Sequence, residues 1–145
     1  MSGYSFKFEK LLNYKEKIED IKKVEFTESS NKLNMEVEKL SSYNRYKESL
    51  LNKKNSRNTA SVGEYRLFCN YINDLTKKIE NQKKVVEDAK EEFNKAKEEL
   101  LVAMQERKSF ERLKEIQYEE YLNEIKKQEE KLIDNIVTYK TNTQQ

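Results

Sequence analysis

The residue types that most often perform acid–base, metal-binding and nucleophilic chemistry are scarce in this sequence. Among its 145 residues there is no histidine, the commonest general acid–base group and metal ligand. The single cysteine, Cys69, has no histidine to activate it, and free cysteines are most often small buried side chains. Gly3 and Gly63 are the only glycines, and they lie too far apart for a phosphate-binding loop. We therefore expect no catalytic residue, no metal site, no cofactor and no enzymatic activity.

Charged side chains dominate the composition, but the two signs almost balance. Charged residues make up 39% and hydrophobic residues 35%, against roughly 25% and 45–50% in ordinary soluble domains. The formal net charge is only +2, and the nine Tyr and six Phe argue against a disordered chain. Interleaved charges leave no basic face for nucleic acid, and no apolar run reaches the roughly 20 residues that a membrane span needs. With no signal-peptide pattern at the N-terminus, we expect a cytoplasmic protein without direct membrane insertion.

The lack of proline and the rarity of glycine favour long helices. Too little apolar material is present for a wide core, but a coiled-coil seam needs only two apolar positions in seven. Turn-forming residues concentrate at positions 55–63. The sequence predicts an all-α fold, an elongated antiparallel two-helix coiled coil in a single domain. Helix one should cover about 5–52, the tip about 53–62, and a longer helix two about 63–138.

Apolar residues at heptad spacing predict which face of the first helix packs against the second. They occupy two frames, with Leu11, Tyr14, Ile18 and Ile21 in one and Leu33, Val37 and Leu40 in the other. The change of frame falls near residues 25–31, where we expect the supercoil to unwind locally without ending the helix.

The second helix carries a longer heptad pattern. Fourteen positions, twelve of them apolar, keep one frame: Tyr65, Phe68, Ile72, Leu75, Ile79, Gln82, Val86, Ala89, Phe93, Ala96, Leu100, Ala103, Arg107 and Phe110. The frame then slips by one residue and resumes at Tyr118, Leu122, Ile125, Glu129, Leu132, Ile136 and Tyr139. With helices of roughly 48 and 75 residues, the second extends about 40 Å beyond the first. An unpaired apolar stripe of this size predicts a partner.

Aromatic residues near the tip are not explained by this seam. Tyr43, Tyr46 and Leu50 share one face of the first helix, and Tyr71 lies across the turn beside Ile72. They could pack along the groove with their hydroxyls in water. They could equally form an exposed aromatic patch of the kind found in protein interfaces.

Short motifs near both ends of the chain resemble those of the FliJ family, the flagellar type III export protein. The segment from Phe6 through Phe8, Leu11 and Leu12 to Lys15 is similar to that family's F-x-F-x-x-L-L-x-x-R/K start. The segment 129–135 is similar to its E-Q-K-x-x-D-E signature, preceded by Tyr118, Tyr121 and Leu122. Glu130 and Asn135 depart from that signature, where the family usually has Gln and Glu.

The resemblance implies a coiled coil that acts as the stalk of a rotary-type export ATPase. In the family, the end bearing both termini enters a hexameric export ATPase and promotes its assembly and activity. The residues expected at that contact are Phe8, Leu11, Leu12, Tyr118, Leu122, Ile125, Glu129, Leu132 and Asp134. The region near the tip binds the cytoplasmic linker of the membrane-embedded export gate. The residues expected there are Tyr43, Tyr46, Leu50, Tyr71, Leu75, Lys78 and Gln82.

The resemblance further implies contact with export chaperones and a position at the cytoplasmic face of the flagellar base. Without it, a generic coiled-coil chaperone or a cytoskeletal tether would fit the same helices. A prefoldin-like chaperone would need β-strands, and the sequence around the turn has no strand pattern. A tether should dimerise through its long helix, whereas a stalk should be monomeric or weakly dimeric.

Overall fold

Two helices account for nearly all of the chain in the computed structural model, which describes residues 3–56 and 61–143. Helix α1 spans Glu9–Ser56 and helix α2 spans Val62–Thr143. No strand occurs in the described part of the chain, so the predicted all-α fold with a longer second helix is confirmed. Within the same residues, no helix is long and apolar enough to cross a membrane.

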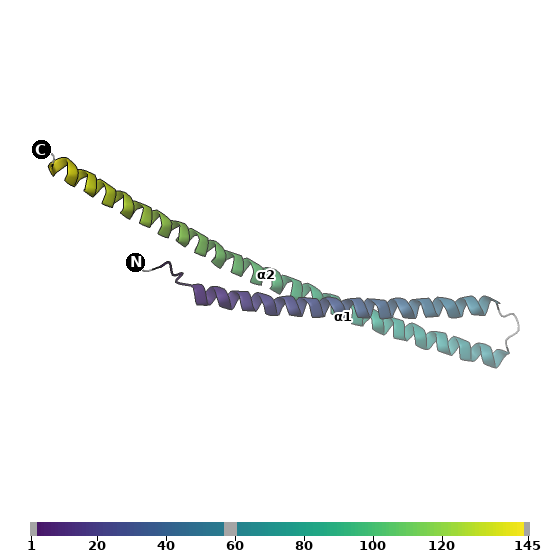
Figure 1. Cartoon of the computed structure of the whole chain (residues 1–145). Helices are drawn as coiled ribbons and strands as arrows, with labels where there is room; N and C mark the ends of the chain where they lie inside the picture. Colours follow the sequence, from purple (N-terminus) through teal and green to yellow (C-terminus); the bar gives the residue numbers. More distant parts are fainter. Residues whose placement is uncertain (1–2, 57–60, 144–145) are drawn as a thin grey trace. The chain divides into compact units, whose positions relative to one another are not determined.

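The helices run antiparallel, because contacts move backward along α2 as they move forward along α1 (Figure 1). Near the N-terminus the Lys114 ammonium lies 2.9 Å from the Glu9 carboxylate, and the Lys15 ammonium 2.8 Å from Glu106. Farther along α1, Lys32 contacts Glu92 at 3.1 Å. By its contacts the chain divides into two compact units. We call Met1–Asp20 with Val102–Gln145 the terminal unit, and Ile21–Leu101 the tip unit.

Three helix boundaries differ from the predicted ones by four or five residues, and the start of α2 differs by one. Helix α1 begins at Glu9 rather than near residue 5 and continues to Ser56. The later start is explained by Phe6, whose side chain is buried and whose carbonyl accepts a hydrogen bond from the Glu9 amide. At the start of α2, the Glu64 amide donates to the Ser61 hydroxyl at 3.2 Å, a standard N-cap contact. Of the predicted tip, residues 57–60 lie outside the described part of the chain.

In the tip unit, α2 packs with the face that the heptads predicted. Residues Leu75, Ile79, Gln82, Ala89 and Ala96 are buried, and the intervening frame positions from Phe68 to Leu100 are half-buried. The alanines lie seven residues apart, which lets the facing helix approach closely at that layer.

The packing face of α1 in the tip unit agrees with the predicted one only at Leu33 and Leu40. Most half-buried positions keep one 3-4 spacing: Lys22, Phe26, Ser29, Leu33, Glu36, Leu40, Tyr43, Lys47 and Leu50, with Glu25 and Ser30 half-buried beside it. The predicted change of frame near residues 25–31 is therefore wrong, and Ile21 and Val37 are exposed. The reason is that charged side chains take seam positions where α2 supplies ion-pair partners. Lys22, for example, contacts Glu99 at 3.1 Å.

In the terminal unit, too, the residues that pack between the helices differ from the predicted ones. Leu12 is only 3% exposed, while the predicted seam residues Leu11 and Tyr14 are 38% and 56% exposed. On α2, the frame of Phe110 continues through the half-buried Lys114, Gln117 and Tyr121. The predicted slip of frame does not occur here, because Lys114 is held at the seam by Glu9.

Candidate partner-binding surfaces

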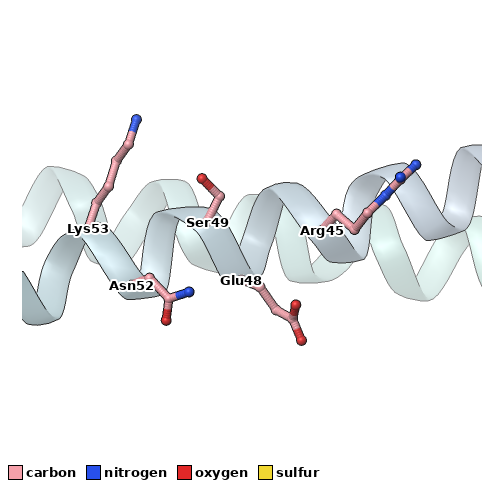
Figure 2. Close-up of a pocket in the computed structure, with 5 residues that line it drawn as sticks. All are labelled: Arg45, Glu48, Ser49, Asn52 and Lys53. Carbon is pink, nitrogen blue, oxygen red and sulfur yellow. The ribbon is translucent and has the colours of Figure 1, made fainter.

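The described residues include no group of three or more side chains that could hold a metal ion. Figure 2 shows a surface depression lined by Arg45, Glu48, Ser49, Asn52 and Lys53. All five belong to α1, and the side chains of Lys53 and Glu48 point in opposite directions (Figure 2). A depression on a single helix does not surround a substrate or converge polar groups on it. The two candidate surfaces described below, one on each unit, instead carry exposed aromatic or apolar side chains.

The first candidate surface lies on the tip unit and consists of Tyr43, Tyr46, Tyr71 and Lys78, which we call the tip aromatic surface. Tyr46 and Tyr71 are 46% and 48% exposed, and their rings meet edge to face with centroids 6.4 Å apart. Their hydroxyl oxygens are 3.1 Å apart, and either hydroxyl can donate. This hydrogen bond raises the pKa of Tyr71 above the ordinary tyrosine value. The Lys78 ammonium lies 5.1 Å from the centroid of the Tyr43 ring, within the range of a cation–π contact.

The remaining residues predicted for this surface lie in the seam. Leu75 and Gln82 are buried, and Leu50 is half-buried. The Gln82 amide donates to the carboxylate of Glu36 at 2.6 Å and to its backbone carbonyl at 3.0 Å. These residues can support the tip aromatic surface, but only Tyr46, Tyr71 and Lys78 are open to a partner. Of the two interpretations of the tyrosines, Tyr43 fits groove packing and Tyr46 fits an exposed patch.

An aromatic cluster in the terminal unit joins the segment before α1 to α2. The Tyr4 ring lies 5.1 Å from Tyr118 and 5.4 Å from Tyr121, centroid to centroid. Its hydroxyl donates to the Lys114 carbonyl at 3.2 Å. Phe8 packs edge to face on Phe110, with centroids 6.4 Å apart. Tyr118, predicted to contact a partner, therefore already has an intramolecular neighbour. Sequence reasoning missed Tyr4, although its place near the F-x-F motif was an available signal.

Ion pairs hold the seam of the terminal unit and were also missed. The Arg107 guanidinium donates to the Glu19 carboxylate, which is only 4% exposed, and contacts Glu111 at 2.8 Å. Hydrogen bonds to these two carboxylates raise the pKa of Arg107. In the same way, the contact with Glu9 raises the pKa of Lys114. Heptad spacing placed Arg107 on the seam of α2, but it gave no signal for its partner Glu19 or for Lys114.

The second candidate surface is the distal part of α2. Every residue from 126 to 143 is exposed. Its apolar side chains, with the half-buried Ile125, form what we call the distal stripe: Leu122, Ile125, Leu132, Ile136 and Tyr139. Exposures reach 61% at Leu132 and 70% at Tyr139. A continuous apolar stripe of this length is uncommon on a protein that works alone.

The other residues predicted to contact the ATPase differ in their position and in their exposure. Glu129 and Asp134 are exposed on distal α2, Glu129 within the heptad frame of the distal stripe and Asp134 outside it. Leu11 is exposed on α1, whereas Phe8 is half-buried and Leu12 is buried. The predicted set therefore separates into an exposed group on distal α2, the exposed Leu11, and a packed pair, Phe8 and Leu12, around the start of α1.

Comparison with known proteins identifies the chain by its whole length rather than by a local motif. A family model described as "Flagellar FliJ protein" matches residues 4–145. A search of curated proteins and a search of solved structures each found no match. Because the family model covers essentially every residue of the two helices, the chain belongs to the FliJ family of flagellar proteins.

Proposed function

We propose that this component of the flagellar export apparatus is a non-catalytic stalk that links the export ATPase to the export gate. In this account the distal stripe binds the hexameric ATPase and promotes its assembly. The tip aromatic surface binds the cytoplasmic linker of the gate. The protein then acts at the cytoplasmic face of the flagellar base, where export chaperones are further candidate partners.

The observation that carries the ATPase half of the proposal is the exposure of the distal stripe. Its side chains, Leu132 and Ile136 among them, gain free energy only when another surface removes them from water, at about 25 cal/mol per Å² of apolar area. Charged side chains such as Lys126 and Lys140 border the stripe on one side, giving part of the polar rim usual around an interface core.

A helix inserted into a ring also presents different side chains to subunits that are chemically identical. Contacts that differ between subunits bias their conformational states by the difference in binding free energy. This is a physical route by which a protein without catalytic residues can change the rate of an ATPase.

The gate half of the proposal is carried by Tyr46 and Tyr71. Both rings are about half exposed, yet each is held by the other. Rigid, amphipathic tyrosines are enriched in interfaces because they bury large area with little loss of side-chain entropy.

Binding of the purified chain to the export ATPase of the same organism tests the first half. We expect Leu122→Asp to weaken binding at least tenfold, because it places a charge in the apolar stripe. Asn123→Asp is the matched control, since it adds the same carboxylate one residue away at an exposed position. Equal loss of affinity in both variants, or in neither, would remove the distal stripe from the proposal.

A further inference from the structure

The distal stripe has a second property that its exposure alone does not explain, namely the arrangement of charge beside it. The heptad positions predicted for this segment are Leu122, Ile125, Glu129, Leu132, Ile136 and Tyr139, one residue out of the frame that packs through Tyr121, and they span about 27 Å of helix. One flank of the seam carries Glu119, Lys126, Ile133 and Lys140. The other flank carries Tyr121, Gln128 and Asn135, none of which is charged.

This one-sided charge pattern selects the orientation of a helical partner. In a parallel pair, interhelical ion pairs join one flank of the first helix to the opposite flank of the second. Because the flank of Gln128 carries no charge, two parallel copies of this segment would form none. In an antiparallel pair, each flank faces the same flank of the second helix. The flank that carries Glu119 and Lys140 therefore lies opposite the equivalent flank of the other copy.

We propose that the distal stripes of two copies of this chain pair in the antiparallel direction. One register satisfies both the apolar and the charged positions. It places Glu119 of each copy opposite Lys140 of the other, so that two ion pairs form by symmetry. If one copy is shifted along the other by one heptad in either direction, both Glu119–Lys140 ion pairs are lost. In one of these two registers, Lys126 of one copy also lies opposite Lys126 of the other.

The same register matches the apolar positions. Leu122 lies opposite Tyr139 of the second copy, and Ile125 opposite Ile136. On the charged flank, Ile133 faces Lys126, whose aliphatic stem covers an apolar side chain while its ammonium stays in water. This contact explains why an exposed apolar residue, Ile133, stands outside the heptad positions of this segment.

Glu129 sets the strength of the pairing. In this register it faces Leu132 of the second copy, so a carboxylate occupies two of the six seam layers. A polar residue at a seam position fixes the register and reduces the stability. The dimer is therefore weak and reversible. If the ATPase uses the same stripe, as the proposed function has it, dimer and ATPase binding are mutually exclusive.

Disulfide trapping with the purified chain tests orientation and register without the ATPase. In a Cys69→Ser background, one preparation carries Ile125→Cys and another carries Ile136→Cys. Under mild oxidation we expect a cross-linked dimer when the two are mixed and little when each is oxidised alone. Self-linking of Ile125→Cys would indicate parallel pairing. That result, or no cross-link in the mixture, overturns the proposal.

Sedimentation equilibrium then tests the charge pairs. The wild-type chain should show a concentration-dependent monomer–dimer equilibrium. Lys140→Glu should raise the dissociation constant by about tenfold, because two attractive pairs become repulsive. Glu119→Lys with Lys140→Glu should restore the wild-type value, and Glu129→Leu should lower it. A monomer at all concentrations, or failure of the charge swap to restore pairing, contradicts the proposal. Because no ATPase is present, these results do not depend on the proposed function.

Discussion

Glu19 of α1 and Arg107 of α2 form an ion pair within the seam of the terminal unit, where helix packing leaves Glu19 only 4% exposed. Arg107 also contacts Glu111 on its own helix at 2.8 Å. A buried carboxylate with a hydrogen-bonding cation is tolerated, whereas the same carboxylate without one is strongly unfavourable. The pair therefore fixes how the two helices align in this unit.

We predict that Arg107→Leu lowers the thermal unfolding midpoint, because it leaves the Glu19 carboxylate buried without its partner. The double variant Glu19→Leu with Arg107→Leu should recover the wild-type midpoint or exceed it, since buried pairs often exchange for apolar residues without loss. Circular dichroism at 222 nm measures both. A double variant less stable than Arg107→Leu would mean that the pair itself, and not an orphaned charge, is the source of stability.

The packing frame of α1 is tested by two neighbouring leucines. Leu12→Ala should reduce the free energy of unfolding by about 2–4 kcal/mol, because it creates a cavity in the seam. Leu11→Ala removes the same atoms from an exposed position and should change it by less than about 0.5 kcal/mol. Urea titration of both variants decides between the frames. The opposite ranking would restore the frame expected from the heptads.

The sequence was sufficient to predict the fold class and the packing face of α2 as far as Phe110, but only part of that of α1. Along α2 the seam is built mostly from apolar residues such as Ile79 and Ala89, which heptad spacing alone detects. Along α1, Lys15 and Glu19 occupy the seam because Glu106 and Arg107 meet them from positions 91 and 88 residues away. Nothing local distinguishes such a lysine from a solvated one. Leu11 and Leu12 are the same residue type, so only heptad spacing could distinguish them, and it predicted Leu11 rather than Leu12 at the seam.

The candidate surfaces, too, were predicted from the sequence only in part. The exposed distal stripe followed from the unequal helix lengths, and the Tyr46 patch from its spacing. Burial of Leu75 and Gln82 followed from the same heptads that predicted the seam. The contact of Tyr4 with Tyr118 did not follow from the sequence, because it depends on a non-helical segment folding back on α2.

Alkaline pH should weaken the contact between Tyr71 and Tyr46. The hydrogen bond to Tyr46 raises the pKa of Tyr71 above 10.0, so the contact stabilises the fold below that pH. Its contribution is lost as the pH rises through the raised value and the phenol ionises. A titration of tyrosinate absorbance should show one group ionising at lower pH in Tyr46→Phe than in the wild type. Curves that differ only by the loss of one of the nine tyrosines, with no group shifted to lower pH, would contradict a hydrogen bond between the two hydroxyls in solution.

Gate binding should depend on the tip aromatic surface without depending on the seam. Tyr46→Ala with Tyr71→Ala should reduce affinity for the gate linker at least tenfold, because it removes both exposed rings and leaves the buried layers intact. The control is Arg45→Ala with Leu67→Ala, two exposed neighbours, one on each helix. Helical content measured by circular dichroism should match the wild type in both. A loss of helicity in the tyrosine variant would place these rings in the core.

The most direct test of the stalk proposal is whether the chain bridges its two partners. Gate linker is immobilised, and capture of the export ATPase is measured with wild-type chain, Leu122→Asp, or Tyr46→Ala with Tyr71→Ala. We predict capture only with the wild type, with Leu122→Asp still bound to the linker and the tyrosine variant still bound to the ATPase. If both variants capture the ATPase as well as the wild type does, or if capture occurs without the chain, the two surfaces do not form the bridge proposed here.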